Sequence, residues 1–390
     1  MMELSHKRFD EVFDLQLGRT PARGVDKYWG GANTWVSIAD MGQSKYISSS
    51  KECISDIALE ETGIPLVPKD VVIMSFKLSI GKVAITKRAL YTNEAIMAFI
   101  PKTETKILND YLYYYLQGYK WDNSNNVVMG FTLNKKSISS SIISYPSLTE
   151  QQRIVDILDQ EFAKIDALKA NAEKSLQAAK DLFQATLKKE LEPKAGWRSH
   201  KLNEIYDVRD GTHDSPKYHL SGYPLATSKN LRNGIVDLSN VKLISKQDYD
   251  KINERSKVDV GDVLFAMIGT IGNPCLVESE PNYAIKNMAL FKVPKNQSGK
   301  LLKYILSTDD VLNVMRGQSK GSNQPFVSLG YLRNYIITIP NSFDEQVRLV
   351  ARLDDLNERC NSLQENYQKT LSLCDNLKQS LLRKAFNGEL

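Results

Sequence analysis

Apolar and polar positions follow two patterns along this chain, and each pattern occurs twice. Short runs rich in β-branched residues, such as Val71–Met74, Val263–Met267 and Tyr335–Ile339, are bounded by Gly, Pro or Asp and predict β-strands. Residues 148–191 and 343–390 instead place apolar residues at alternating steps of three and four, which predicts long helices. The chain is therefore predicted to hold two mixed α/β regions, each followed by a long helix.

The two apolar stripes predict that the long helices pack on each other. A heptad stripe can also indicate a homodimer, but here one chain supplies two stripes, so an intramolecular partner is present at high effective concentration. An antiparallel coiled coil is favoured because the intervening region must return the chain to the start of the second helix. At about 1.5 Å per residue, each helix would be a spacer of about 65 Å. The positions predicted to pack are Ile154, Leu158, Ile165, Leu168, Leu182, Leu349, Leu353, Leu356, Leu363, Tyr367, Leu377 and Leu381.

Nearly the same phrase opens both helical segments. SLTEQQRIV begins at Ser147 and SFDEQVRLV begins at Ser342, so the two copies lie 195 residues apart in a chain of 390. In each copy a Ser is followed three residues later by Glu, which is the spacing of a helix capping box. Looser matches, such as FDEVFDLQLG (9–18) with LNEIYDVRDG (202–211), extend the repeat into the α/β regions.

This repeat defines the predicted fold class and domains. The fold is predicted as α+β with an internal pseudo-twofold repeat, consisting of two mixed α/β domains separated by two long helices in an antiparallel coiled coil. The predicted boundaries are 1–147 for the first domain, 148–191 for the first helix, 192–342 for the second domain and 343–390 for the second helix.

Charge is distributed unevenly between these parts, although the whole chain carries only +5. Residues 1–147 hold 17 basic and 15 acidic side chains, and residues 192–342 hold 20 and 15, whereas each helical segment holds seven basic and eight acidic side chains. Basic domains on an internally neutralised scaffold favour a polyanionic partner. Ordinary solvated surface remains the alternative, especially for the first domain.

Several classes of protein are disfavoured by what the sequence lacks. No stretch has the length of a membrane span and the N-terminus lacks the order of a signal peptide, so a cytoplasmic protein without membrane contact is expected. The four cysteines lack C-x-x-C spacing and are expected to be reduced structural thiols. The four histidines show no zinc-site spacing, so no metal site is predicted.

Catalytic motifs are also missing. Asn273-Pro274-Cys275 lacks the second proline and the aromatic residue of a base-methylating motif, and the sequences SIGK (79–82) and GTIG (269–272) lack the spacing of a phosphate-binding loop. We therefore expect no catalytic residue in this chain. A stand-alone DNA methyltransferase or nuclease, and a purely structural coiled-coil protein, remain the competing hypotheses.

Four phrases of the sequence resemble a known family. They are DGTHDSPKYHLSGYPLATSKNLRNG (210–234), GDVLFAMIGTIGN (261–273), NMALF (287–291) and FDEQVRLV (343–350). The chain resembles, over its whole length, the specificity (S) subunit of a type I restriction-modification system. The first domain lacks the H-D-S-P motif of the family. Its corresponding loop has the sequence GRTPARGVDKYWGGANTWVSIADMG (18–42).

The resemblance implies a function and a set of partners. Each α/β domain would be a target-recognition domain that reads one half of a bipartite double-stranded DNA site, while the coiled coil sets the spacing and docks methyltransferase (M) subunits. Two M subunits and additional restriction (R) subunits are expected as partners. The chain itself would bind no cofactor, because S-adenosylmethionine, ATP and Mg²⁺ are expected on the partner subunits.

The residue types that read DNA give a set of candidate contacts. Phosphates are bound by Lys and Arg, whereas base edges are read by side chains with two hydrogen-bonding groups, such as Asn, Gln and Arg. Each candidate can alternatively be a solvated loop side chain, and the tyrosine run at 111–115 can stack on bases or pack in the core. The first-domain candidates are Arg19, Arg23, Lys27, Tyr28, Lys45, Lys77 and Lys82. The second-domain candidates are Thr212, His213, Lys217, Lys229, Asn230, Arg232, Lys320, Asn323 and Gln324.

Overall fold

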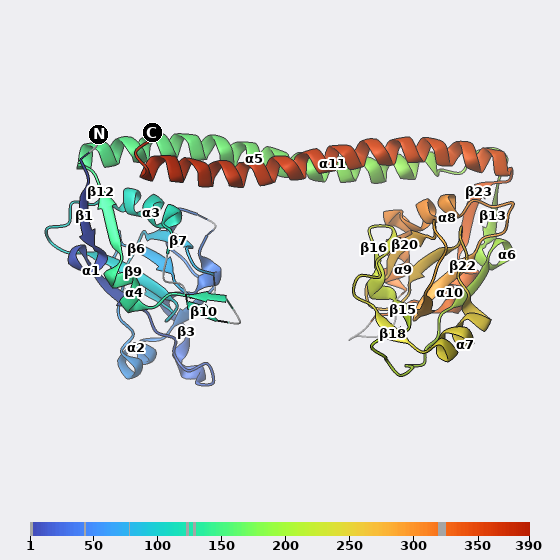
Figure 1. Ribbon diagram of the computed structural model, residues 1–390, viewed down its shortest axis with the longest axis horizontal. Helices are drawn as coiled ribbons and strands as arrows, with labels where there is room; N and C mark the ends of the chain where they lie inside the picture. The colour runs from blue at the N-terminus through green and yellow to red at the C-terminus, as the bar shows by residue number, and fades with distance from the viewer. Residues whose placement is uncertain (1–2, 43, 78, 122–124, 128–129, 319–324) are drawn as a thin grey trace. The chain divides into compact units, whose positions relative to one another are not determined.

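The computed structural model describes residues 3–42, 44–77, 79–121, 125–127, 130–318 and 325–390. The chain forms two compact units (Figure 1). The first unit contains residues 1–172 and 369–390, and the second contains residues 173–368. Each unit therefore combines one α/β domain with segments of both long helices.

The α/β domain of the first unit is built on a five-stranded sheet. Its strand order is β2-β9-β6-β7-β4, in which β4 pairs with β7 in parallel and the other neighbours are antiparallel. The strands are β2 (Phe13–Leu17), β9 (Ile96–Pro101), β6 (Val72–Ser75), β7 (Val83–Thr86) and β4 (Tyr46–Ile47). Every residue of β6 and β7 is buried, which explains why these strands read as continuous apolar runs rather than alternating ones.

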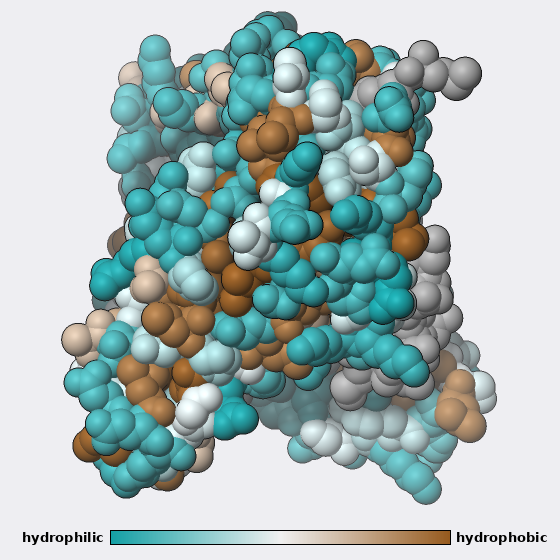
Figure 2. Space-filling view, turned by 90° about the vertical axis from the view of Figure 1, so that its left-hand side faces the viewer, coloured by the Kyte–Doolittle hydropathy of each residue, from teal (hydrophilic) through white to brown (hydrophobic). Residues whose placement is uncertain are grey.

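Smaller elements complete this domain. A three-stranded sheet, in the order β5-β3-β8, packs Trp35 and Ile54 into a separate core. The face of the molecule shown in Figure 2 is mainly hydrophilic, and groups of apolar side chains are exposed among the hydrophilic ones. The remaining strands are β3 (Trp29–Val36), β5 (Glu52–Ile54), β8 (Tyr91–Thr92), β1 (Ser5–Arg8), β12 (Ile142–Tyr145), β10 (Asn125–Val127) and β11 (Gly130–Thr132). The helices are α1 (Phe9–Val12), α2 (Asp56–Thr62), α3 (Asn109–Gly118), α4 (Lys135–Ser140) and the short 3₁₀ turns η1 (Asp26–Tyr28) and η2 (Ile38–Asp40).

The α/β domain of the second unit repeats this plan with a four-stranded sheet in the order β14-β22-β19-β20 and a three-stranded sheet in the order β18-β15-β21. The strands are β13 (Trp197–Lys201), β14 (Asp207–Asp210), β15 (Tyr223–Thr227), β16 (Leu231–Arg232), β17 (Ile235–Val236), β18 (Lys242–Ile244), β19 (Val263–Ala266), β20 (Gly272–Leu276), β21 (Ala284–Lys286), β22 (Met288–Lys292) and β23 (Ile336–Pro340). The helices are α6 (Leu202–Ile205), α7 (Lys246–Ser256), α8 (Gly299–Leu306), α9 (Asp309–Gly317), α10 (Leu329–Asn334) and η3 (Ser228–Asn230).

The predicted repeat is present in the structure. In each unit an antiparallel pair, β1–β12 or β13–β23, leads directly into a long helix. The tyrosine run at 111–115 lies in α3, and α8 is the corresponding short helix of the second unit. Tyr111, Tyr114 and Tyr115 are buried in the core, so they do not offer faces for stacking on bases.

The two long helices begin where the repeated phrase predicts. They are α5 (Leu148–Glu190) and α11 (Phe343–Phe386). The Ser147 hydroxyl accepts a hydrogen bond of 3.4 Å from the Glu150 backbone N–H, as the capping box predicts. The second half of the box does not form as predicted, because the Glu150 carboxylate instead binds Arg153 and that of Glu345 accepts a hydrogen bond from Trp197.

Ion pairs within each unit confirm that the two helices run antiparallel. In the first unit, Lys169 pairs with Asp375 at 2.7 Å and Lys378 pairs with Asp166 at 2.5 Å, so residue numbers rise on α5 as they fall on α11. In the second unit, Arg352 of α11 pairs with Glu190 at the end of α5 at 3.3 Å.

The positions of the predicted apolar seam differ in burial, and several of the buried ones lie in the domain cores. Ile154, Leu158, Ile165, Leu349 and Leu353 are buried, and Leu158 and Leu353, which pack into the domain cores, each contribute about 1.5–3 kcal/mol through burial. Intermediate exposure is found for Leu356, Tyr367 and Leu381.

Four leucines predicted to pack between the helices are instead exposed. Leu168, Leu182, Leu363 and Leu377 are 57%, 53%, 41% and 48% exposed. The inward position of α5 is occupied by small residues, Ala172 and Ala179, and the apolar stripe is wider than the strip that a single partner helix can cover. The leucines at the edge of the stripe therefore remain accessible.

Candidate nucleic-acid interface

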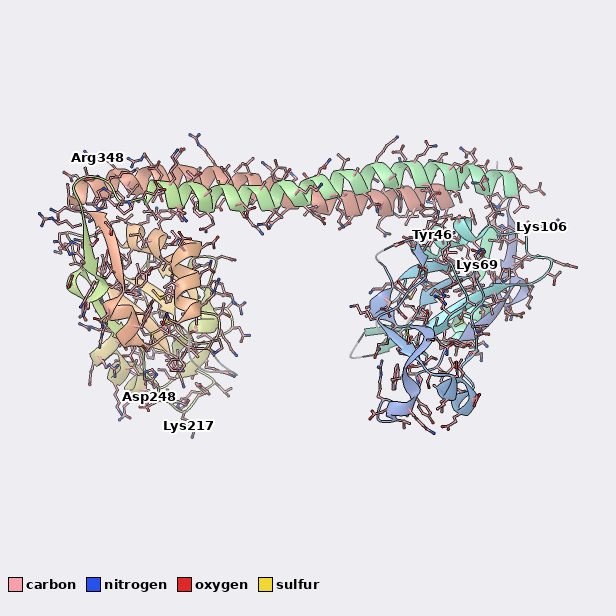
Figure 3. All side chains as sticks on the ribbon, turned by 180° about the vertical axis from the view of Figure 1, so that it is seen from behind. Tyr46, Lys69, Lys106, Lys217, Asp248 and Arg348 are labelled. Atoms are coloured by element: carbon pink, nitrogen blue, oxygen red, sulfur yellow. The ribbon has the colours of Figure 1, made fainter. Side chains whose placement is uncertain are left out.

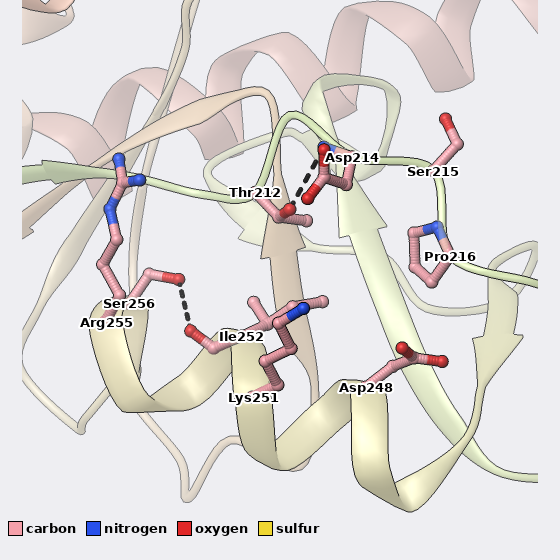
Figure 4. Close-up of a pocket in the computed structure, with 9 residues that line it drawn as sticks. All are labelled: Thr212, Asp214, Ser215, Pro216, Asp248, Lys251, Ile252, Arg255 and Ser256. Atoms are coloured by element: carbon pink, nitrogen blue, oxygen red, sulfur yellow. Dashed lines mark hydrogen bonds between the residues drawn. The ribbon is translucent and has the colours of Figure 1, made fainter.

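A pocket lies between the loop 211–217 and helix α7 in the second unit (Figure 4). It lies at the end of the domain away from Arg348 of α11, where Lys217 and Asp248 are also found (Figure 3). The pocket has a volume of about 230 Å³. Its lining residues are Thr212, Asp214, Ser215, Pro216, Asp248, Lys251, Ile252, Arg255 and Ser256.

The loop on one side of this pocket is held by a network around Asp210. This carboxylate is only 6% exposed and accepts hydrogen bonds from Arg255 and, at 2.8 Å, from Nε2 of His213. Nδ1 of His213 lies 2.9 Å from Oδ1 of Asn287. Behind the loop, the buried Lys286 ammonium donates a hydrogen bond of 2.5 Å to the Ser215 hydroxyl.

This network assigns structural contacts to two of the candidates. Both ring nitrogens of His213 face protein oxygens, so the histidine anchors the loop and leaves only its ring faces open. Thr212 Oγ1 accepts a hydrogen bond of 3.2 Å from the Asp214 backbone N–H and still lines the pocket.

Two predicted cations of the second domain are free to bind an anion. Lys217 and Lys229 are exposed, and within the described residues neither side chain has an ion-pair partner. Arg232 is also exposed, but its Nε donates to the Lys229 carbonyl at 2.9 Å and its guanidinium lies 4.0 Å from Asp237.

Asn230 does not have the free amide that reading a base would require. It is 8% exposed, and its Oδ1 accepts hydrogen bonds of 2.9 and 3.0 Å from the backbone and hydroxyl of Thr227. Its Nδ2 donates to the Asp237 carbonyl at 2.9 Å. The structure therefore gives Asn230 internal hydrogen-bond partners, and these partners do not support the predicted DNA contact. Three further candidates, Lys320, Asn323 and Gln324, lie outside the described residues.

The candidate loop of the first domain is tied to the strand and helix that follow it. Arg23 donates to both oxygens of Glu52 at 2.5 and 3.0 Å and lies 4.0 Å above the Trp29 ring. Lys27 and Tyr28 donate to opposite oxygens of Glu61 at 2.6 and 2.7 Å.

These contacts neutralise the loop. Hydrogen bonds from Arg23 lower the pKa of Glu52, and hydrogen bonds from Lys27 and Tyr28 lower the pKa of Glu61. Both carboxylates therefore stay ionised beside their cations. The guanidinium of Arg19 donates to the Thr62 carbonyl. The loop thus presents aromatic and cationic side chains, and the cations Arg23 and Lys27 are paired with carboxylates of the same domain.

Lys45, a predicted DNA contact, is held by two carboxylates of its own unit. Its ammonium pairs with Asp110 and Asp159, both at 2.8 Å, and its side chain is 16% exposed. Burial opposes its charge, but the hydrogen bonds to the two carboxylates outweigh that effect and raise the pKa of Lys45. The lysine joins the domain to helix α5 and is not available to DNA. Lys82 donates a hydrogen bond of 3.1 Å to the Ile38 carbonyl, and the Lys77 ammonium lies 5.5 Å from the Phe76 ring.

Sequence reasoning missed several groups that the fold brings to accessible positions. Lys251 and Asp214 face the pocket of the second domain, and within the described residues neither charged group has an ion-pair partner. In the first domain Lys69 is exposed, and Lys87 lies 3.8 Å from the ring of Tyr46, which is labelled with Lys69 in Figure 3. Asp214 lies within the phrase DGTHDSPK (210–217) that supplied other candidates, whereas the sequence carries no comparable signal for Lys251.

The side chains at these sites are of types that bind nucleic acid. A carboxylate can accept from the amino group of cytosine, and Lys can bind guanine or a phosphate. Among the described residues, no group of three or more His, Cys, Asp or Glu side chains is arranged to hold a metal ion. In the same part of the chain, no helix has the length and apolar character needed to cross a bilayer.

Comparison with known proteins gives a consistent result. The family model of the type I restriction modification DNA specificity domain matches twice, over residues 2–178 and 194–373. The specificity subunit of the type I restriction enzyme MjaIX from Methanocaldococcus jannaschii is 24% identical, with 98% of this chain and 93% of that protein covered. The EcoBI specificity subunit of Escherichia coli is 27% identical, with 74% and 67% covered.

Solved structures share the fold. A chain of a type I restriction-modification assembly matches with a TM-score of 0.76 and 18% identity over the full length of both chains. The HsdS subunit from Thermoanaerobacter tengcongensis matches with a TM-score of 0.54 and 17% identity, covering 99% of this chain and 97% of that one.

Proposed function

The chain belongs to the family of type I restriction modification DNA specificity proteins, with two such domains in tandem, and from this premise we propose how it reads DNA. Each α/β domain binds one half of a bipartite site in double-stranded DNA. The long helices α5 and α11 set the gap between the two halves. The chain is the DNA-reading subunit of a type I restriction-modification complex and acts in the cytoplasm.

The observation that carries this proposal is a repeated framework with unlike loops. Each unit has the same strand pair leading into a long helix and the same short helix beside it. The accessible loops differ: the first domain presents Arg23 and Trp29 near β5, whereas the second presents a pocket beside α7. A scaffold gains nothing from two different loop sets, but a reader of two different half-sites requires them.

Catalysis and cofactors belong to partner subunits in this proposal. Methyltransferase subunits supply S-adenosylmethionine and extrude the target base, which requires a dedicated pocket. Restriction subunits supply ATP hydrolysis and Mg²⁺-dependent cleavage. The specificity subunit contributes the choice of DNA sequence and does not catalyse a reaction.

The exposed leucines of the long helices support docking of two methyltransferase subunits. In the first unit, Leu168 and Leu377 lie in the stretch that the Lys169–Asp375 ion pair brings together. Their equivalents 195 residues away are Leu363 and Leu182, which lie in the second unit. Each unit therefore carries one exposed leucine on each long helix, at equivalent positions, which fits one copy of the same partner on each.

The test is to map methylated bases in the DNA of the host with and without this gene. The proposal predicts that a motif with two specific halves and a fixed gap loses its methylation when the gene is deleted. An unchanged pattern in a host with active partner subunits would contradict it. Calorimetry on the purified chain alone should detect no binding of S-adenosylmethionine.

A further inference from the structure

Gln151, from the repeated phrase, is fully buried and joins three parts of the first unit. Its Oε1 accepts a hydrogen bond of 2.9 Å from the backbone N–H of Leu108, the residue that precedes α3. Its Nε2 donates to the carbonyls of Lys106 and Pro146, both at 2.9 Å. The side chain therefore connects the first turn of α5 to the start of α3 and to the end of β12.

Gln346 makes the equivalent contacts in the second unit. Its Oε1 accepts a hydrogen bond of 3.0 Å from the backbone N–H of Ser298, which precedes α8, and its Nε2 donates to the Pro340 carbonyl at 3.0 Å. The third contact differs, because Nε2 donates to the side-chain Oε1 of Gln297 at 2.9 Å. The two buried glutamines share two of their three contacts, which gives the repeated phrase the same structural role in each unit.

A second point of attachment lies two turns further along each long helix. In the first unit the Tyr114 hydroxyl of α3 donates to Asp159 of α5, which also binds Lys45. The equivalents 190 and 195 residues later are Tyr304 and Asp354, whose hydrogen bond is 2.7 Å. Lys300 binds the same carboxylate at 2.9 Å.

These two points together define an orientation. Apolar burial along α5 and α11 holds each domain to its helix, but it is non-directional and permits small rotations. Hydrogen bonds have strict distance and angle requirements. Eight residues separate Gln151 from Asp159, and likewise Gln346 from Asp354, which is about 12 Å along a helix. Two directional contacts at that separation fix the angle of the short helix against the long one.

We propose that these two pairs are positioning residues for target recognition. In each unit the glutamine and the aspartate set the angle at which the α/β domain leaves its long helix, and this angle determines which gap between half-sites is accepted. The proposal rests on the proposed function, because it assumes a bipartite target. The positioning residues are Gln151, Asp159, Gln346 and Asp354.

The experiment uses the complete methyltransferase, purified with its partner subunits. DNA substrates carry the two half-sites separated by the native gap or by one base pair more or less, and initial methylation rates are measured for each. Gln346→Leu removes the three side-chain hydrogen bonds of the buried glutamine in the second unit. Tyr304→Phe is a milder variant, because it removes only a hydroxyl group and is expected to fold.

For Tyr304→Phe we expect the preference for the native gap over the altered gaps to fall by about fivefold, the equilibrium factor of one net hydrogen bond. For Gln346→Leu, which removes three side-chain hydrogen bonds, we expect the preference to fall by at least this factor. Gln152→Leu is the matched control, because this neighbouring glutamine is exposed and only binds Asp156. It should keep the wild-type preference. A purely structural role would lower methylation of all substrates by the same factor, and an unchanged ratio in the folded variants would overturn the inference.

The two proposals fail in distinguishable ways. If the wild-type complex methylates no bipartite substrate, the proposed function is wrong. If the wild-type complex prefers one gap and the Gln346→Leu and Tyr304→Phe variants keep that preference, the proposed function stands and the positioning role is wrong.

Discussion

The hydroxyl group of Tyr304 on α8 donates a hydrogen bond of 2.7 Å to the carboxylate of Asp354 on α11. Burial, followed by this hydrogen bond, raises the pKa of Tyr304, so the hydroxyl remains a donor throughout the physiological pH range. Because Asp354 is partly exposed, we expect Tyr304→Phe to lower the free energy of unfolding by about 1 kcal/mol. Urea denaturation of the purified chain measures this change.

A matched control for this substitution is Tyr218→Phe. Tyr218 is 47% exposed, and its hydroxyl has no hydrogen-bond partner among the described residues. This variant should unfold at the wild-type urea concentration. Equal destabilisation by both substitutions would show that the Tyr304 hydroxyl contributes nothing specific.

The repeat explains why so much of the fold could be predicted. Val263–Met267 and Tyr335–Ile339 were predicted as strands and form β19 and β23, displaced by one residue at most at an end. Ser147 marks the start of α5 because a hydroxyl cap is a local interaction that depends on few residues. The exposure of Leu168 could not be predicted, because periodicity identifies an apolar stripe but not how much of it a partner covers.

Lys45 is predicted to stabilise the first unit and to leave DNA binding unchanged. Removing it leaves Asp110 and Asp159 without their shared cation, and since both carboxylates are partly exposed we expect Lys45→Ala to cost about 1–2 kcal/mol. Denaturation in urea measures the loss. A matching loss of salt-sensitive DNA affinity without destabilisation would contradict this assignment.

The contribution of Lys45 also has a defined pH dependence. Because its pKa is raised in the folded state, the stabilisation is complete below the ordinary lysine pKa of about 10.4 and is lost as the pH rises through the folded value. The difference in stability between wild type and Lys45→Ala should therefore be constant from pH 7 to 9 and shrink in more alkaline solution.

Lys217 and Lys229 are predicted to contact phosphates. Each is exposed and has no ion-pair partner in the described chain, so each can release a counterion when DNA binds. For each Lys→Ala variant we expect the slope of log K against log salt concentration to fall in magnitude by about 0.9. Fluorescence anisotropy with the assembled complex at several salt concentrations measures the slope. Lys246→Ala is the control, because this lysine pairs with Asp250 at 2.9 Å.

Asn230 is predicted to act on stability rather than on base recognition. Asn230→Ala leaves the Thr227 backbone N–H and the Asp237 carbonyl without their partners, which should cost about 1–3 kcal/mol. The exposed Asn240→Ala is the control. If Asn230→Ala keeps wild-type stability but changes the methylated motif, then Asn230 reads a base and its assignment as a structural residue is wrong.

The candidate site was harder to predict than the fold for a physical reason. Lys45, Lys217 and Asn230 all have residue types suited to DNA, but the sequence does not show which of them has a partner within the fold. Lys45 finds its carboxylate 114 residues away on α5. Conversely, Lys251 becomes a pocket residue only because α7 packs beside a loop that lies more than thirty residues earlier.

The central claim is that the two domains read different halves of one DNA target. Its most direct test is to exchange residues 1–147 for the corresponding domain of a relative with a different target and to sequence the methylated motif in cells that supply the partner subunits. We predict that one half of the motif changes while the other half and the gap remain. A change in both halves, or an unchanged motif, would contradict the account.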